Sequence, residues 1–392
     1  MRGLDQQMRR ELEELDGRGL HRSLRPLETA CDPEVRLHGR RVLQLSSNNY
    51  LGLATHPELR AAAREAIDQW GCGAGASRLI TGHTDLHADV EHRLAAFKGT
   101  EAALLFPSGY QANLGAIGAL MRAGDHIYSD ALNHASIIDG CRLARAAVHV
   151  FPHRDAAALD AALRNAPAGG RRLIVTDSVF SMDGDRTPLA DLAEVAERHD
   201  AILMVDEAHA TGILGERGAG LAEECALTHR IDVHMGTLGK ALGGAGAYLA
   251  GSRALIDLIV NRARSFVFTT GLAPAAVAAA GAAIAVVQRE PERRRRVLAH
   301  AEKLRRGLRA MGLDAGGDTH IVPVLLGDNR ATLAFAAALL EHGVLVHPIR
   351  PPTVPAGTAR LRVTPMATHT DAQLDQALEA FASAARACGA PR

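Results

Sequence analysis

Residues 201–212 read AILMVDEAHATG, and residues 233–240 read VHMGTLGK. Each stretch begins as an apolar run of strand length and is followed by a side chain that can do chemistry, Asp206 in the first and Lys240 in the second. A carboxylate at the end of a buried strand is partly removed from water and needs a cationic partner. A desolvated lysine loses proton affinity, and its amine becomes a nucleophile toward carbonyl groups. Taken singly, Lys240 is more simply explained as a surface lysine at a strand end, and Asp206 with His209 as a buried structural pair.

Similar apolar runs alternate with segments of helical periodicity through the middle of the chain. The runs are AALLF (102–106), HIYSD (126–130), AVHVF (147–151), LIVTDSV (173–179), AYLAG (247–251) and FVFTT (266–270). The helical segments include residues 55–70, 85–98, 109–122, 134–145, 155–165 and 188–199. This alternation predicts an α/β fold with a mostly parallel sheet between helices, in which functional residues gather at the carboxyl ends of the strands.

The length and the change of pattern along the chain predict more than one domain. The 392 residues exceed what one domain usually holds. After residue 287 the chain changes to charged helices and short strands. We therefore expect an N-terminal helical arm over residues 1–45, a large domain over residues 46–285 and a smaller C-terminal α/β domain over residues 286–392.

Composition argues against several classes of function. The 44 Lys and Arg residues balance 44 Asp and Glu residues, whereas a nucleic-acid-binding protein normally has a basic excess. Five scattered cysteines form no close pair, which argues against a disulfide framework or a zinc site, and we expect no metal. The N-terminus has no secretion signal, and the alanine-rich run 271–287 contains Pro274 and predicts a buried helix. We expect a cytoplasmic protein with no membrane or nucleic-acid partner.

Other strand ends add groups that suit a phosphorylated, planar ligand. In PSGYQAN (107–113), Ser108, Gly109 and Tyr110 open a helix, and backbone amides at a helix N-terminus bind phosphate. His134 begins the next helix, where it can stack on a planar ligand or cap the helix. Pyridoxal phosphate (PLP) would supply the cation that Asp206 needs, because its ring nitrogen is protonated when paired with an aspartate.

Five motifs together resemble one enzyme family. They are SNNYLGL (47–53), LNHAS (132–136), VFSMDGD (179–185), VDEAHATG (205–212) and TLGK (237–240). In order and spacing they closely resemble the α-oxoamine synthases, a subfamily of fold-type I PLP-dependent enzymes. The resemblance runs from about residue 40 to residue 385. It implies a fold-type I transferase, in which the large domain binds PLP and the smaller C-terminal α/β domain completes the chain.

The resemblance also implies a role for each candidate residue. Lys240 would form the Schiff base with PLP and transfer protons, Asp206 would pair with the ring nitrogen, His134 would stack on the ring, and His209 would contact its phenolic oxygen. Ser181 and Thr237 would hold the cofactor, while Ser108, Gly109, Tyr110 and Thr270, the last from a partner subunit, would bind its phosphate. Asn48 and Arg362 would hold the amino-acid carboxylate, with Arg350 beside them.

The segment HPIRPPTVPAGTARLRVT (347–364) resembles the members of this family that use alanine in biotin biosynthesis. It implies that a homodimer with a shared active site condenses L-alanine with a pimeloyl thioester, carried by CoA or by a carrier protein. The distal carboxylate of the acyl chain would meet Arg22 or Arg25. Two alternatives stay open: a sister synthase that uses glycine with acetyl-CoA or succinyl-CoA, and a non-catalytic subunit, against which the presence of Lys240 argues.

Overall fold

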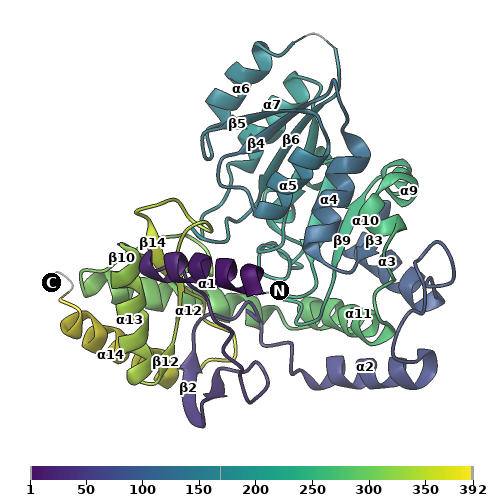
Figure 1. Cartoon of the computed structure of the whole chain (residues 1–392). Helices are drawn as coiled ribbons and strands as arrows, with labels where there is room; N and C mark the ends of the chain where they lie inside the picture. Colours follow the sequence, from purple (N-terminus) through teal and green to yellow (C-terminus); the bar gives the residue numbers. More distant parts are fainter. Residues whose placement is uncertain (1, 168, 390–392) are drawn as a thin grey trace. The chain divides into compact units, whose positions relative to one another are not determined.

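The computed structural model describes residues 2–167 and 169–389 (Figure 1). Contacts divide the chain into two units. The large unit contains residues 51–181 and 186–295, and the small unit contains the residues up to 50, residues 182–185 and the residues from 296 onward. The N-terminal residues, which we expected to form an arm of their own, thus group with the C-terminal part.

A seven-stranded sheet forms the centre of the large unit. Its strands are β3 (Ala102–Phe106), β4 (His126–Asp130), β5 (Ala147–Phe151), β6 (Arg172–Asp177), β7 (Ile202–Asp206), β8 (Val233–Thr237) and β9 (Ala247–Gly251), in the order β3-β9-β8-β7-β6-β4-β5. The strands from β4 to β8 are parallel, and β9 runs antiparallel to both of its neighbours. The predicted mostly parallel sheet is therefore confirmed. The register pairs Asp177 with Asp206 and Asp206 with Met235, so the ends of β6, β7 and β8 meet at one edge.

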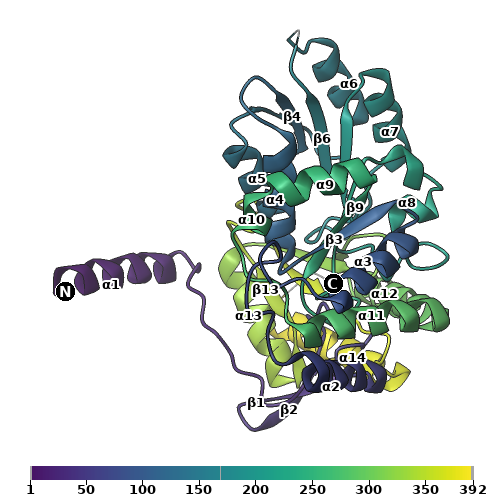
Figure 2. The ribbon, with the colours of Figure 1, turned by 90° about the vertical axis from the view of Figure 1, so that its right-hand side faces the viewer.

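The large unit also contains helices. They are α2 (Pro57–Trp70), α3 (Asp85–Lys98), α4 (Gly109–Leu120), α5 (Ala135–Leu143), α6 (Ala156–Arg164), α7 (Leu189–Arg198), α8 (Leu221–Glu224), α9 (Arg253–Arg262), α10 (Arg264–Val267) and α11 (Pro274–Arg289), with a 3-10 turn at Thr228–Arg230. Buried residues of α4, α5, α9 and α10 form one core with side chains of the strands, and α4, α9 and α10 lie together in Figure 2. α4 and α5 begin directly after β3 and shortly after β4, so both helices start at the edge where the parallel strands end.

The prediction of a strand at FVFTT was wrong. Arg264–Val267 is the short helix α10, and Phe266 is buried against Phe106 with 5.6 Å between the ring centroids. Beyond the helix, Thr270 makes an isolated bridge with Ser77. Aromatic and β-branched residues favour strands, but the packing of Phe266 in the core of α4 and α9 overrides that preference.

The small unit contains two sheets. The first is antiparallel and consists of β10 (Asp314–Ala315), β11 (Val322–Gly327), β14 (Ala359–Val363) and β13 (His347–Ile349), in that order. The second consists of β1 (Glu34–Leu37), β2 (Arg40–Gln44) and β12 (Val344–Leu345). Leu361 and Val363 of β14 belong to the hydrophobic core with α13 (Asn329–Glu341), α14 (Asp371–Ala387) and the end of α12 (Pro291–Ala310). Since side chains alternate along a strand, Arg360 and Arg362 point to the other face of β14.

Two further helices bear on the sequence predictions. α1 (Arg2–Gly17) confirms the helix expected at the N-terminus. The alanine-rich run 271–287 forms α11, in which Val277, Ala280 and Ile284 are buried. Within residues 2–167 and 169–389, no helix combines the length and the apolar character needed to cross a membrane.

Candidate active site

Lys240 lies beside His209 in the large unit. Lys240 is the third residue after the end of β8, and His209 is the third residue after the end of β7. The Nζ atom of Lys240 is 2.9 Å from Nε2 of His209. His209 is buried, whereas Lys240 is half-buried. An amine and an imidazole at this distance can exchange a proton, which suits a residue that must act both as a nucleophile and as a base.

The other two lysines of the chain are held by carboxylates. Lys98 forms a buried ion pair with Glu207, and Lys303 pairs with Asp371 and Asp375 at 3.3 and 2.6 Å. Burial alone would lower the pKa of Lys98, but Glu207 raises it above its ordinary value. The hydrogen bond to Asp375 likewise raises the pKa of Lys303. Both lysines therefore stay protonated, whereas Lys240 lies beside the imidazole of His209.

Asp206 is held in a fixed orientation at the end of β7. Its side chain is buried, its Oδ1 atom accepts a hydrogen bond from the backbone N–H of Ala208 at 2.9 Å, and its Oδ2 atom accepts one from Nδ2 of Asn113 at 2.8 Å. The same Nδ2 atom donates to Ser136 Oγ at 2.9 Å. The sequence analysis missed Asn113. It lies four residues after Gly109, hence on the same face of α4 as the expected phosphate site, and that spacing was the available signal.

A second carboxyl group, that of Asp177, lies next to Asp206 at the end of β6. Burial, and then the neighbouring charge of Asp206, raise the pKa of Asp177 well above its ordinary value. Its Oδ2 atom accepts a hydrogen bond from the backbone N–H of His134 at 2.8 Å. Asp177 thus links the end of β6 to the start of α5, a link that the sequence analysis did not foresee.

His134 is the N-cap residue of α5. Its Nδ1 atom accepts a hydrogen bond from the backbone N–H of Ser136 at 3.2 Å and lies 2.8 Å from Ser136 Oγ. The capping role considered for this histidine is therefore present in the structure. The cap fixes one edge of the imidazole, while the residue as a whole remains exposed and available to a ligand. Burial of the ring lowers the pKa of His134, which favours the neutral imidazole.

The start of α4 provides a place for a small anion. Ser108 caps the helix and accepts a hydrogen bond from the N–H of Gln111 at 3.2 Å. A Cβ atom on Gly109 would lie 2.9 Å from side-chain atoms of both Met235 and Thr237, so any larger residue would force these side chains to move. The Oγ1 atom of Thr237 is buried and has no hydrogen-bond partner within the described ranges. Backbone amides and an unsatisfied hydroxyl at one helix N-terminus are suitable for phosphate.

Three other candidates of the large unit are less closely tied to this group. Tyr110 is exposed and donates a hydrogen bond to Asp139. Ser181 is half-buried and follows β6 by four residues. Thr270 is exposed, and the neighbouring Thr269 accepts a hydrogen bond from Gln111 at 3.3 Å, which places this segment beside the start of α4.

The small unit brings Asn48 and Arg362 together, as expected. Arg362 donates from Nη1 to Asn48 Oδ1 at 3.0 Å and from Nη2 to the hydroxyl of Tyr50 at 2.9 Å. The hydroxyl of Tyr50 in turn donates to Asn48 Oδ1 at 2.9 Å. Tyr50 was missed in the sequence analysis, although it belongs to the same motif as Asn48. The closed arrangement holds the guanidinium in one plane, which is what binding of a carboxylate by two hydrogen bonds requires.

Arg350 belongs to a cluster of basic side chains in the small unit. It is buried and donates to the carbonyl of Gly19, while Arg22 donates from Nη2 to the carbonyl of Pro351 at 2.9 Å. Burial, and then the charges of Arg350, Arg25 and Arg22, lower the pKa of His347. None of the three arginines forms an ion pair with a carboxylate of the described residues. The cluster, with both Arg22 and Arg25 in it, is therefore suited to an anion.

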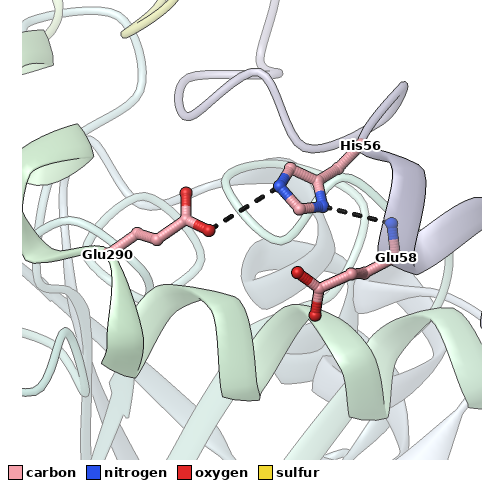
Figure 3. Close-up of side chains that lie close together, drawn as sticks. All are labelled: His56, Glu58 and Glu290. Atoms are coloured by element: carbon pink, nitrogen blue, oxygen red, sulfur yellow. Dashed lines mark hydrogen bonds and ion pairs between the residues drawn. The ribbon is translucent and has the colours of Figure 1, made fainter.

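One group of possible metal ligands occurs among the described residues (Figure 3). His56, Glu58 and Glu290 lie close together, but the Nδ1 atom of His56 accepts a hydrogen bond from the N–H of Glu58 at 3.4 Å. Arg289 contacts both carboxylates, and Arg293 donates to Glu290 at 2.6 Å. Two arginines thus balance the two glutamates, and we read the group as an ion-pair network that links α2 to the end of α11.

Comparison with known proteins defines the class of this fold and site. Residues 40–381 match the family described as aminotransferase class I and II. The chain belongs to this family, whose members are PLP-dependent enzymes of fold type I, with a central, mostly parallel sheet between helices.

Curated relatives narrow the class. The 8-amino-7-oxononanoate synthase of Citrifermentans bemidjiense is 52% identical over 370 residues, which cover 94% of this chain and 95% of the relative. The synthase of the same name from Anaeromyxobacter dehalogenans is 54% identical over 374 residues, which cover 95% of this chain and 94% of the relative. Within its family, the chain is thus a PLP-dependent acyltransferase of the 8-amino-7-oxononanoate synthase type.

Solved structures agree with this grouping. Serine palmitoyltransferase from S. paucimobilis, with a bound PLP–myriocin aldimine, has a TM-score of 0.94 at 35% identity over 98% of both chains. The 8-amino-7-oxononanoate synthase from Francisella tularensis has a TM-score of 0.76 at 27% identity, over 88% of this chain and 98% of that one.

The residues of the large unit fit PLP. The cofactor requires an amine for its aldehyde, a carboxylate for its ring nitrogen and donors for its phosphate. Lys240 supplies the amine, and Asp206 supplies a carboxylate whose orientation Asn113 fixes. The unsatisfied hydroxyl of Thr237 and the start of α4 supply the donors.

Proposed function

We propose that this enzyme uses PLP bound to Lys240 to condense L-alanine with a pimeloyl thioester, giving 8-amino-7-oxononanoate, carbon dioxide and a free thiol in biotin biosynthesis. The observation that supports the cofactor chemistry is the contact between Lys240 and His209 beside Asp206, where three strand ends meet. The names of relatives with 52% and 54% sequence identity over nearly the full chain support the choice of substrates.

Each residue of the large unit is assigned a separate role in the chemistry of the amino acid. When bound, PLP supplies a protonated ring that withdraws electrons from the α-carbon of the amino acid. Asp206 keeps the proton on the ring nitrogen, and the amine of Lys240 removes the α-proton and later returns one. His209 lies within reach of the Lys240 amine and would contact the phenolic oxygen of the ring. His134 would stack on the ring, and Ser181 would help to hold the cofactor from the segment after β6.

The phosphate of the cofactor is assigned to the start of α4. Ser108, Gly109 and Tyr110 would surround it together with Thr237, and Thr270 would reach it from a partner subunit in a homodimer. The phosphate then fixes the position of the ring relative to Lys240, because a helix N-terminus binds an anion in a defined place. The cytoplasmic location expected from the sequence stays a prediction.

The residues of the small unit are assigned to the two ends of the substrates. Arg362 and Asn48 bind the carboxylate of L-alanine, because the guanidinium, held by Asn48 and Tyr50, can receive a carboxylate in its own plane. The cluster of Arg22, Arg25 and Arg350 accepts the distal carboxylate of the acyl chain, since no carboxylate of the described residues neutralises it. Carbon–carbon bond formation at the thioester carbonyl releases the thiol, and loss of the alanine carboxylate as carbon dioxide completes the reaction.

A substrate screen tests this assignment. The purified protein, loaded with PLP, is mixed with L-alanine, glycine or L-serine and with pimeloyl, acetyl, succinyl or palmitoyl thioesters, and release of the thiol is followed. We expect the largest kcat/KM for L-alanine with a pimeloyl thioester. Comparing pimeloyl-CoA with a pimeloyl carrier protein then identifies the acyl carrier.

A sister synthase is the second candidate, and one observation favours it. The TM-score to serine palmitoyltransferase is higher than that to the Francisella 8-amino-7-oxononanoate synthase. The family thus uses nearly the same backbone for other amino acids and acyl chains. Turnover of glycine or L-serine with an acetyl, succinyl or palmitoyl thioester, in the absence of turnover with a pimeloyl thioester, would assign the chain to this second candidate.

A further inference from the structure

A buried ion pair lies next to the candidate cofactor site. Glu207 follows Asp206 in sequence, and neither Glu207 nor its partner Lys98 is appreciably exposed. Burial alone would raise the pKa of Glu207, but Lys98 and His234 lower it to about 2. Lys98 is the last residue of α3, so its charge also lies where the helix dipole favours a cation. Both members of the pair are therefore charged in the folded protein.

Residues 219–222 contact both members of this ion pair. Lys98 also donates to the carbonyl of Ala219, and the backbone N–H of Ala222 donates to Glu207 Oε1 at 3.0 Å. Gly220 has a φ of 126°, and any side chain at this position would overlap the Glu207 carboxylate. The Nδ1 atom of His234 lies 3.5 Å from Glu207 Oε2. The Glu207 carboxylate thus contacts Lys98, the backbone of Ala222 and His234.

The backbone of Glu207 organises the turn that carries the cofactor-site residues. Its N–H donates to the carbonyl of Met235 at 2.7 Å, which extends the pairing of β7 with β8. Its carbonyl accepts hydrogen bonds from Ala210 at 3.0 Å and from Thr211 at 2.8 Å. These bonds close the turn 207–211, in which His209 faces Lys240. A shift of Glu207 would therefore move Asp206 on one side and His209 on the other.

We propose that Glu207 is a positioning residue: its buried contacts with Lys98 and Ala222 fix the turn 207–211, and thereby the places of Asp206 and His209 relative to Lys240. The proposal rests on the proposed PLP chemistry for its effect on the cofactor, but its structural part concerns the protein alone. Burying an ion pair contributes little net stability compared with apolar side chains of similar size. Placement of the turn is therefore the contribution that this pair makes and that an apolar pair would not make.

The test separates placement from stability with three variants. Glu207→Gln keeps the shape and the acceptor for Ala222 but removes the charge. The double variant Lys98→Met/Glu207→Met replaces the pair with apolar side chains. Asp160→Asn is the matched control, because Asp160 is a buried carboxylate paired with Arg198 and His199 on α7 and at its end, and it has no contact with the turn.

Three measurements are made on each variant. The first is the melting temperature of the protein without PLP. The second is hydrogen exchange of the amides of Ala210 and Thr211, also without PLP. The third is the Kd for PLP, obtained by absorbance titration, together with the pH midpoint of the absorbance of the lysine-bound cofactor.

We expect Glu207→Gln to raise the exchange rates of the two amides and the Kd for PLP at least tenfold and to shift the pH midpoint, whereas Asp160→Asn lowers the melting temperature without these changes. Compared with Glu207→Gln, the double variant should regain the melting temperature of the wild-type protein. It should not regain the slow exchange of the two amides or the wild-type Kd for PLP. A double variant with wild-type melting temperature, amide exchange and Kd for PLP would overturn the proposal. If the double variant does not fold, equal changes in exchange and Kd for Glu207→Gln and Asp160→Asn overturn it. Failure of the wild-type protein to bind PLP would refute the proposed function instead, and the exchange measurement would still decide the positioning role.

Discussion

Asn113 donates a hydrogen bond from Nδ2 to Oδ2 of Asp206 over 2.8 Å, across 93 positions of sequence. The helix that begins at the proposed phosphate site therefore also orients Asp206, the carboxylate proposed to hold the ring nitrogen. Ser108 caps α4, and Asn113 lies in its second turn. One rigid element thus sets the distance between two groups that must bind the same molecule, which is how enzymes achieve preorganised binding.

Asn113→Ala should weaken PLP binding. It removes a hydrogen bond to a charged group, which is worth about 1.5–3 kcal/mol, so the Kd for PLP should rise roughly 10- to 100-fold. Asn113→Asp should be worse above neutral pH, because two carboxylates would then repel each other beside the ring nitrogen. Absorbance titrations with PLP at pH 6 and pH 8 measure both effects.

Asn133→Ala provides the control for Asn113. Asn133 is also buried and bonds to Ser129, to the carbonyl of Val175 and to the N–H of Asp177, but not to Asp206. It should lower the melting temperature with a much smaller change in Kd. Similar Kd values for the two alanine variants at similar melting temperatures would show that Asn113 has no particular role in orienting Asp206.

Lys240→Ala should abolish the absorbance near 420 nm that a lysine–PLP Schiff base is expected to produce, and with it the thiol release. Lys303→Ala is the matched control, because Lys303 is half-buried like Lys240 but pairs with Asp371 and Asp375 in the small unit. Its absorbance and rate should equal those of the wild-type protein. An absorbance band that survives in Lys240→Ala but disappears in a variant of another lysine would reassign the attachment site.

The sequence predicted the large sheet because parallel strands, buried on both faces, are continuous apolar runs. The same rule failed at FVFTT, where Phe266 is buried by a helix and not by a sheet. Asp206, Lys240 and His209 could be found because a strand end is visible in the chain itself. The contacts of Asn113 with Asp206 and of Tyr50 with Arg362 could not be predicted, since these partners are 93 and 312 residues apart and only folding brings them together.

Arg362→Gln should raise the KM for L-alanine about 10- to 100-fold, because it removes the charge that binds the carboxylate. Arg362→Lys keeps the charge but loses the planar fork, so it should recover only part of the affinity. Steady-state kinetics with alanine varied at saturating thioester measure this. Arg360→Gln is the control: Arg360 lies on the same strand and pairs with Asp183. An unchanged KM for alanine in Arg362→Gln would remove Arg362 from the substrate site.

Within the basic cluster, Arg22 should bind the distal carboxylate of the acyl chain. The Nη2 atom of Arg22 is held by the carbonyl of Pro351 at 2.9 Å, whereas Arg25 forms no hydrogen bond or ion pair with the described residues. A fixed guanidinium loses less entropy on binding. Arg22→Gln should therefore reduce the preference for a pimeloyl over a heptanoyl thioester about tenfold or more, and Arg25→Gln should reduce it less. The reverse order would assign the carboxylate to Arg25.

Acid should destabilise the protein partly through His369. This buried residue of the small unit accepts a hydrogen bond at Nδ1 from the N–H of Met366 at 2.8 Å, and its Nε2 lies 3.1 Å from the carbonyl of Gln44. Burial lowers the pKa of His369 to about 4, below the value of about 6.5 expected in the unfolded chain. Between these values the unfolded state binds the proton and the folded state does not. Folding stability should therefore fall by at most about 1.4 kcal/mol per pH unit as the pH drops from about 6.5 to 4.

A comparison of two histidine variants isolates this contribution. His369→Gln cannot take up the proton, so its free energy of unfolding, although lower at neutral pH because the fitted ring is lost, should decline less steeply from pH 7 to pH 5 than that of the wild-type protein. His342→Gln changes an exposed histidine at the end of α13 and should keep the wild-type slope. Denaturant unfolding at several pH values gives the slopes. Equal slopes for His369→Gln and the wild type would mean that His369 is protonated in the folded protein as readily as in the unfolded chain, and that its two backbone contacts tolerate the charge.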